Sequence, residues 1–314
     1  MGRAEAKVAA PLLFLGLING PMINSLREGN TTHIILLLLV LALLLWRSRR
    51  DYMAGLVLGV CAVIKLPLLL FGAYFFLRGK WRVVLGGVTL IATVALLSLA
   101  VYGLQGNIDW YRDSVEPFLG GVIPAFNVQS IDGFLIRLWT GESLLHDWDP
   151  MLPNTLHKVL RYILFLLVYG SALWFGWRNS GIEPVPAANG ELSARNTLEF
   201  ALVINLAIIT SPISWTHYYL LLLIPWGLYL GGRLALPEDR TTRWLMWSSL
   251  VLTSLPVIIP QPSPSLLTEV LARTIVSAWF FGGLLMFAAL MRGLWKLTSS
   301  SNLQPELAGR HATS

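Results

Sequence analysis

The chain has 314 residues, of which 55% are hydrophobic and only 13% are charged, and its mean hydropathy is +0.64. A soluble domain carries about 25% charged residues, so this composition excludes an ordinary water-soluble fold and indicates a polytopic helical membrane protein. The net charge of +6 does not indicate nucleic-acid binding, because lysine and arginine in membrane proteins mark the cytoplasmic loops. The single cysteine, Cys61, can form no internal disulfide, and no spacing of metal ligands or cofactor motif stands out.

The N-terminal part of the chain predicts an outward and an inward crossing. Residues 8–26 form the first span, with a kink expected at Asn19, Gly20 and Pro21. A short outer loop at 27–33 follows, and residues 34–46 return to a basic cluster at 47–50. The N-terminal run is read as a span and not as a signal peptide, because it lacks a clear small-residue cleavage site.

The next apolar segment, residues 52–77, has basic clusters on both flanks, at 47–50 and at 78–82. The positive-inside rule favours both clusters on the cytoplasmic face, so we predict a broken pair of short helices that meet around Lys65 and Pro67. Irregular backbone at membrane depth is tolerated only where it is buried or lines a cavity, so Lys65 would point into a cavity. The alternative is one tilted helix in which Lys65 snorkels to the interface.

The rest of the chain alternates between apolar runs and polar loops. Further crossings are predicted at 83–101, 156–177, 198–209, 220–230, 244–259 and 270–291, with a large outer loop at 102–155 that contains an amphipathic interfacial helix at 131–139. All but seven of the 23 lysines and arginines then fall on the inner side. We therefore expect an all-α, polytopic transmembrane helical bundle of about eight full spans plus the broken pair. Its transmembrane domain would cover residues 1–297 and a cytoplasmic, disordered tail 298–314.

The stretch Ser211-Pro-Ile-Ser-Trp-Thr-His-Tyr-Tyr219 is unusually polar for a turn between two apolar runs. Pro212 ends the first run, and the second begins at once, so these side chains stay at the water–lipid interface. One interpretation is an aromatic belt, which is common at the ends of membrane helices. The other is a polar patch that faces a lipid-linked substrate.

The predicted outer face carries the residue types needed for sugar transfer. A cation such as Lys65 or Arg112 suits a lipid phosphate, because it balances the charge of the leaving group. A carboxylate or histidine is needed to take the proton from an acceptor hydroxyl, and Asp109, Asp113 and His217 are the candidates for this role. Asp109 and Asp113 would share one face of a helix, but a solvated helix end shows this spacing more often than a site does.

Four stretches resemble glycosyltransferase family 87, the polyprenyl-phosphate-mannose-dependent α-mannosyltransferases of the GT-C superfamily. They are Gly29-Asn-Thr-Thr, the segment 54–67 followed by the basic cluster 78–82, Asn127-Val-Gln-Ser130, and the segment 211–218. The resemblance implies a GT-C-like fold and transfer of a mannosyl-type hexose from a polyprenyl phosphate carrier, without a nucleotide sugar or a cofactor. It also implies a lipid or glycan acceptor and a multi-pass protein of the plasma membrane whose active face is extracytoplasmic.

By this resemblance, Lys65 would lie near the carrier phosphate, and Ser214, Trp215, His217 and Tyr218 would line the cavity for the sugar or lipid. The matching polar residues Asn30, Asn127, Gln129 and Ser130 would also bind substrate. The chain departs from the family pattern at Gly29-Asn-Thr-Thr and has one extra residue in Asn127-Val-Gln-Ser130.

The family's first outer loop carries the carboxylate expected to act as the base, and we expect this chain to begin after that region, with only Glu28 in its first outer loop. The chain would then be a truncated copy, or take its base from elsewhere, or be an inactive remnant. A lipid or polyprenol transporter, or a flippase-like accessory, is the competing hypothesis, and it predicts polar groups at the membrane midplane.

Overall fold

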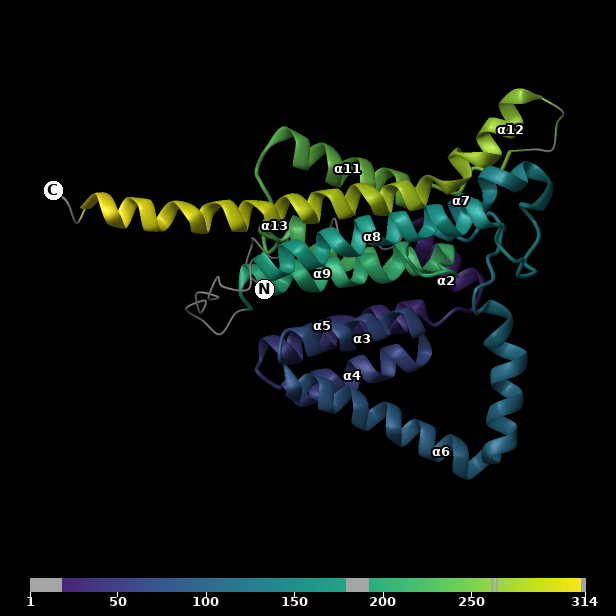
Figure 1. Ribbon diagram of the computed structural model, residues 1–314, viewed down its shortest axis with the longest axis horizontal. Coiled ribbons are helices and arrows are strands. Elements are labelled where there is room, and N and C mark those ends of the chain that lie inside the picture. The colour runs from purple at the N-terminus through teal and green to yellow at the C-terminus, as the bar shows by residue number, and fades with distance from the viewer. Residues whose placement is uncertain (1–18, 179–191, 261–262, 264, 312–314) are drawn as a thin grey trace.

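The computed structural model describes residues 19–178, 192–260, 263 and 265–311, and its described elements are all helical (Figure 1). The all-α expectation is therefore confirmed. The predicted first span and the loop at 178–196 fall largely outside the described residues. Among the described residues, three helical segments are long and apolar enough to cross a membrane, at Trp81–Phe118, Thr155–Arg178 and Leu266–Ser299. Thr32–Arg47, Asp51–Ile64 and Leu66–Leu77 are shorter apolar helices, so the count of about eight spans stays a prediction.

The first described helix, α2 (Gly20–Arg27), begins where the sequence predicts a kink. The Asn19 side chain caps it by accepting a hydrogen bond from the Met22 backbone N–H at 3.2 Å, and Pro21 occupies its first turn. A tight loop with a left-handed Gly29 (φ 60°) leads into α3 (Thr32–Arg47). The α2–α3 junction thus lies at the opposite end of α3 from Arg47.

The predicted broken pair is present. Helix α4 (Asp51–Ile64) ends at Lys65, whose backbone is extended (φ −131°, ψ 96°), and the 3₁₀ turn η1 (Leu66–Leu69) leads into α5 (Leu70–Leu77). Pro67 cannot donate a helical hydrogen bond and restricts the residue before it, which accounts for the break. In Figure 1, α5 runs back alongside α3 and α4, so both basic flanks lie at one end of the bundle. A continuous tilted helix is excluded.

Helix α6 (Trp81–Ser114) packs tightly on α4 through glycines. A Cβ atom at Gly55 would lie 2.0 Å from the Val83 carbonyl oxygen, and one at Gly86 would lie 2.2 Å from the Tyr52 carbonyl oxygen. Such small-residue contacts let membrane helices approach closely. At Gly103, which has non-helical backbone angles (φ 68°, ψ 175°), α6 bends sharply, and Figure 1 shows its second half running back toward the end of the bundle where α7 lies.

The region predicted as the large outer loop holds the short turn η2 (Glu116–Phe118), α7 (Ile131–Thr140), η3 (Gly141–Leu144) and the start of α8 (Thr155–Arg178). The sequence predicts α7 as an amphipathic helix in the interface, but the structure buries six of its ten residues, among them Arg137. The Arg137 guanidinium is satisfied internally by Ser277 Oγ and by the carbonyls of Pro124 and Ala125. This helix is therefore packed inside the protein, where it holds the neighbouring loop in place.

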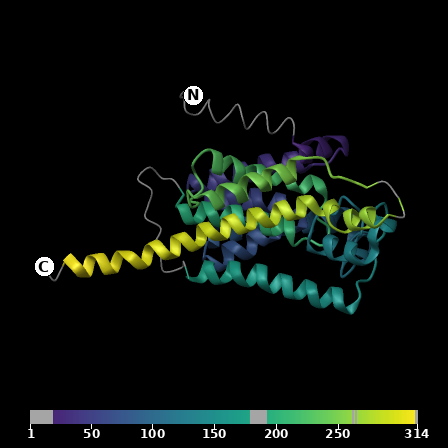
Figure 2. The same cartoon turned by 90° about the horizontal axis from the view of Figure 1, so that it is seen from above.

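The C-terminal half supplies the centre of the bundle. It comprises α9 (Ala194–Ile209), η4 (Thr216–Leu222), α10 (Leu223–Leu230), α11 (Arg240–Ser254), α12 (Leu266–Arg273), η5 (Ile275–Ser277) and α13 (Ala278–His311). Helix α9 is almost wholly buried, and its Phe200 ring packs on Phe71 of α5 at 4.7 Å between centroids. Figure 2 shows that α13 runs the length of the bundle and extends beyond it, into the segment predicted as a tail.

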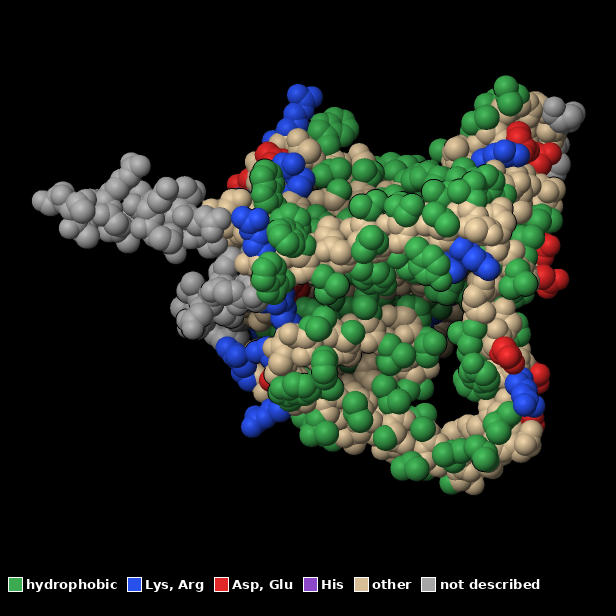
Figure 3. Space-filling model, in the orientation of Figure 1, with side chains coloured by type: hydrophobic (Ala, Val, Ile, Leu, Met, Phe, Trp, Pro, Cys, Tyr) green, Lys and Arg blue, Asp and Glu red, His purple; other side chains and the backbone are tan. Residues whose placement is uncertain are grey.

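Basic side chains gather at one end of the molecule (Figure 3). Arg47 and Arg233 line one groove at this end, while Arg78 and Arg195 bind the same carboxylate. The α2–α3 junction and the break at Lys65 lie at the other end, since Lys65 contacts Asn30. The fold thus separates a basic end from the end that brings the predicted site residues together.

Candidate functional site

Lys65 forms the centre of the candidate site because the break after α4 turns its side chain into the protein. The residue is 5% exposed, and its Nζ lies 3.9 Å from the centroid of the Tyr218 ring and 3.3 Å from Asn30 Oδ1. Within the described part of the chain, no carboxylate forms an ion pair with it. A buried ammonium held only by an amide oxygen and an aromatic face is well suited to an anionic ligand.

Asn30 is oriented by the start of α3. Its Oδ1 accepts hydrogen bonds from the Thr32 backbone N–H at 3.1 Å and from Thr32 Oγ1 at 2.7 Å, as well as from Lys65. This Asx-type turn fixes the amide and leaves the lysine little freedom. The structure therefore brings together Lys65, Asn30 and Tyr218, three of the predicted substrate-binding residues, from three different segments.

The polar segment after α9 pairs with the loop at 127–130. Gln129 N–H donates to the Ser214 carbonyl at 2.6 Å, and Thr216 N–H donates to the Asn127 carbonyl at 2.8 Å. Val128 and Trp215 form the isolated antiparallel bridge between these two hydrogen bonds. Two stretches that lie about 90 residues apart in the chain are thereby paired like a miniature sheet. This pairing sets the orientation of the side chains from Ser214 to Tyr218.

The side chains of Gln129 and Ser130 form hydrogen bonds that stabilise this part of the structure. Gln129 Nε2 donates to the carbonyls of Phe126 and Val276 at 2.7 Å each, and its Oε1 accepts from the Phe280 N–H at 3.2 Å. Ser130 Oγ caps α7, and Asn127 Oδ1 accepts from Trp148 Nε1 at 3.0 Å. The predicted substrate role of these three residues stays a prediction, and their contacts here are those of positioning residues.

His217 lies beside Lys65 and forms a close pair with Glu28. Its Nδ1 is 2.7 Å from Glu28 Oε2, and its side chain is 4% exposed, while that of Glu28 is 41% exposed. The other ring nitrogen, Nε2, is buried and has no hydrogen-bond partner among the described residues, and the same holds for Ser214 Oγ and Thr216 Oγ1. Buried polar atoms without partners are rare and costly in folded proteins. Three of them within four residues point to a polar ligand at this segment.

The charges around this pair fix its protonation. Burial, and after it the positive charge of Lys65, lowers the pKa of His217 to about 3, so the imidazole is neutral at pH 7. Burial raises the pKa of the Glu28 carboxyl above its ordinary value, although half-exposure keeps water in contact with it. An ionised Glu28 has no proton to give, so the Nδ1–H of His217 donates and Nε2 carries the free lone pair.

The carboxylates Asp109 and Asp113 and the guanidinium of Arg112 lie apart from this cluster. They occupy the exposed second half of α6, beyond the bend at Gly103, and Asp109 Oδ1 accepts a hydrogen bond from Gln105 Nε2 at 2.8 Å. In the part of the chain that the structure describes, none of the three forms a hydrogen bond or ion pair with Lys65 or His217. Their predicted roles in catalysis and phosphate binding remain predictions.

A second buried cluster was not predicted from the sequence. Asp132 Oδ1 on α7 lies 2.8 Å from His157 Nε2 and 3.6 Å from Arg161 Nη1, both on α8. Asp132 and His157 are 2% and 0% exposed, and His157 Nδ1 has no partner among the described residues. The i, i+4 spacing of His157 and Arg161 signals a shared face of α8, but nothing in the sequence pairs that face with Asp132.

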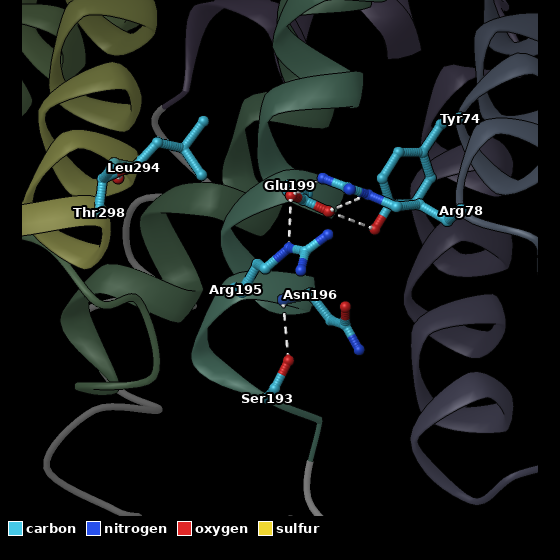
Figure 4. A network of polar contacts seen from close by, with 8 residues as sticks. All are labelled: Tyr74, Arg78, Ser193, Arg195, Asn196, Glu199, Leu294 and Thr298. Atoms are coloured by element: carbon cyan, nitrogen blue, oxygen red, sulfur yellow. Dashed lines mark hydrogen bonds and ion pairs between the residues drawn. The ribbon is translucent and has the colours of Figure 1, made fainter. Parts of the chain in front are cut away.

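A third polar network lies at the basic end, where Glu199 of α9 receives hydrogen bonds from Tyr74 and Arg78 of α5 and from Arg195 one turn earlier (Figure 4). It borders an apolar cavity of about 280 Å³ between α5, α8 and α9. The other large hollows, a groove of about 690 Å³ beside α3 and α10 and a cavity of about 330 Å³ beside α4 and α6, are lined mainly by apolar residues. These spaces suit lipid chains, whereas the Lys65 cluster offers polar chemistry.

The described residues contain no group of three or more histidine, cysteine or carboxylate side chains placed to hold an ion. The residues around Lys65 supply a cation, an imidazole, a carboxylate and hydroxyl groups. This set can bind a phosphate, accept hydrogen bonds from hydroxyl groups and move a proton.

Comparison with known proteins agrees with this chemistry. A polyprenol-phosphate-mannose-dependent alpha-(1-2)-phosphatidylinositol pentamannoside mannosyltransferase of Mycolicibacterium smegmatis is 26% identical over 271 residues, which cover 84% of this chain and 58% of the relative. The chain thus spans somewhat more than half the length of that protein. No solved structure matches. The model of glycosyltransferase family 87 matches residues 1–204, which confirms the resemblance seen in the sequence, and the chain belongs to this family.

Proposed function

We propose that this chain forms the donor-binding part of an integral-membrane glycosyltransferase that moves a mannosyl-type hexose from a polyprenyl phosphate carrier to a lipid or glycan acceptor. Family membership and the mannosyltransferase activity of the mycobacterial relative support the donor class. The observation that carries the proposal is Lys65, a buried ammonium without a carboxylate partner among the described residues. We assign it to the phosphate of the carrier, whose charge increases when the sugar leaves.

The same proposal places the reaction on the extracytoplasmic side of the plasma membrane. The basic end of the molecule would face the cytoplasm by the positive-inside rule, and the Lys65 cluster lies at the opposite end. The apolar cavities and grooves along the helices would accommodate the isoprenoid chain within the bilayer. Donor and acceptor would then meet where the polar side chains gather.

The test is a transfer assay with membranes that hold the protein, using a polyprenyl phosphate mannose donor and a lipid acceptor extract. Lys65→Gln should lower kcat/KM for the donor about 10- to 150-fold, because a hydrogen bond to a charged group is worth about 1.5–3 kcal/mol. Lys158→Gln is the matched control, since Lys158 is exposed near the start of α8. Equal transfer by the two variants would refute the assignment of Lys65, and donor movement across the membrane without a new glycosidic bond would favour a transporter.

A further inference from the structure

The groove of about 690 Å³ at the basic end combines apolar walls with positive charge. Its walls are mainly apolar side chains of α3 and α10, and the start of α9 also borders it. Among the described residues that line it, the charged side chains are those of Arg47, at the end of α3, and Arg233, just after α10. The described lining contains no carboxylate. The groove is therefore complementary to a molecule with an apolar chain and an anionic group at one end.

The start of α9 adds to the positive potential at this end of the groove. Ser193 and Ala194 line it, and Ser193 Oγ caps the helix by accepting a hydrogen bond from the Asn196 N–H at 3.2 Å. The first N–H groups of a helix carry a partial positive charge, and α9 is 16 residues long. The helix start therefore favours an anion on the same side as the two guanidinium groups.

The depth of the groove corresponds to one leaflet of a bilayer. Along α3, the lining runs from Leu36 to Arg47, a rise of about 16 Å at about 1.5 Å per residue. The hydrocarbon core of a bilayer is about 30 Å thick, so the groove reaches from the basic end to about the middle of the membrane. An acyl chain of a phospholipid extends over the same depth in its own leaflet.

We infer that this groove binds an anionic phospholipid from the leaflet at the basic end, with its phosphate at Arg47 and Arg233 and an acyl chain between α3 and α10. Basic pockets between membrane helices bind acidic lipid headgroups. The isoprenoid chain of a sugar carrier would account for the apolar walls but not for the two arginines, because we assign the carrier phosphate to Lys65 at the opposite end. A free phosphate would account for the arginines but not for the apolar walls.

The bound lipid would join the two parts of the chain that meet at the Lys65 cluster. Near that cluster α3 contacts η4 directly, whereas toward the basic end the groove lies between α3 and α10. Lys65 and Asn30 belong to the first part of the chain, and Tyr218 belongs to the second. A phospholipid in the groove would fill the space between these parts, so its binding should stabilise the folded protein.

The test is native mass spectrometry of the full chain in detergent, titrated with phosphatidylglycerol or with phosphatidylcholine of the same acyl chains. The parent protein should bind one phosphatidylglycerol about tenfold or more tightly than phosphatidylcholine. Arg47→Gln and Arg233→Gln should each weaken this binding about fivefold, which is the contribution of one basic side chain near acidic headgroups. Arg82→Gln is the matched control, because Arg82 is exposed at the start of α6 and does not line the groove.

Val40→Trp tests the apolar part of the groove separately, because Val40 is exposed in its wall and the larger side chain fills the space while both arginines stay in place. This variant should bind phosphatidylglycerol more weakly, and phosphatidylglycerol should raise its melting temperature less than that of the parent protein. If the arginine variants do not fold, Val40→Trp and the comparison of the two phospholipids still decide the question.

Three results would overturn the inference. The first is equal binding of the two phospholipids by the parent protein, and the second is phosphatidylglycerol binding that is as tight in Arg47→Gln, Arg233→Gln and Val40→Trp as in Arg82→Gln. The third is tighter binding of polyprenyl phosphate than of phosphatidylglycerol, lost in the same variants, which would assign the groove to the sugar carrier. None of these measurements requires sugar transfer, so an inactive protein would contradict the proposed function and leave this inference standing.

Discussion

Removing the Glu199 carboxylate should be among the most destabilising single changes in this protein. Four donor atoms converge on it: Tyr74 Oη at 3.0 Å, Arg78 Nε at 2.9 Å, Arg195 Nε at 3.0 Å and the Nη2 of Arg78. The Glu199 side chain is 5% exposed, while those of Arg78 and Arg195 are 17% and 12% exposed (Figure 4). Glu199→Ala would leave two guanidinium groups and a phenol around a cavity edge without their shared acceptor.

Loss of one partner from a buried ion pair costs about 3–5 kcal/mol, and the partial exposure of the two arginines places this case near the lower value, at about 3 kcal/mol. The chain offers a comparison at Glu269, which pairs with Arg273 four residues later and whose side chain is 36% exposed. Glu269→Ala should cost at most about 1 kcal/mol.

The free energies of unfolding can be measured in mixed micelles by titration with a denaturing detergent. Glu199→Gln, which keeps the shape and removes the charge, should fall between Glu199→Ala and the parent protein. Equal losses for Glu199→Ala and Glu269→Ala would refute the reasoning, because the Glu199 carboxylate is buried and has three partner residues, whereas Glu269 is more exposed and pairs with Arg273. A loss confined to sugar transfer, with stability unchanged, would also contradict it.

Further substitutions test the packing of α6 on α4, the hydrogen bonds of Gln129 and the pH dependence that Asp239 contributes. Gly86→Val should cost about 1–3 kcal/mol of stability, because its Cβ would meet a backbone carbonyl of α4 at 2.2 Å, whereas Gly170→Val, with only one side-chain atom at 3.9 Å, should cost little. Gln129→Leu should cost about 3 kcal/mol, since it unpairs three buried backbone groups. Hydrogen bonds lower the pKa of the Asp239 carboxyl below its ordinary value of 3.8. Its contribution to the free energy of unfolding is therefore full above pH 3.8 and is lost as the pH falls through the folded-state pKa. Asp239→Asn should weaken this loss of stability at acidic pH in the same unfolding assay.

The sequence predicted those structural elements that depend on residues close together in the chain. Charge on both flanks of one apolar segment, together with Pro67, predicted the break at Lys65, and the structure confirms it. The apolar run at 34–46 predicted α3, and Asn19 with Pro21 marked the start of α2. Each of these features is decided by residues that lie within a few positions of one another, so hydropathy, capping and proline rules are sufficient.

The pairings across long distances in the chain could not be predicted in this way. Glu28 appeared in the sequence only as a carboxylate in an outer loop, and its partner His217 lies 189 positions later. Asp132 and His157 lie only 25 positions apart, yet they meet because α7 is buried, which the amphipathic pattern of 131–139 did not indicate. Helical spacing placed Asp109 and Asp113 on one face, but it contains no information on the bend at Gly103, beyond which the helix is exposed on every face.

The break at Lys65 joins two requirements that look unrelated in the sequence. The basic clusters on its flanks must stay on one side of the membrane, so the chain has to turn back between them. Because it turns back, the tip of the pair reaches the opposite end of α3, where Lys65 meets Asn30 and the Tyr218 ring. A continuous helix would have left this lysine in the middle of an apolar surface, with its charge drawn toward the interface. The charge bias that sets the topology and the cation that we assign to the carrier phosphate are thus consequences of the same interruption in one helix.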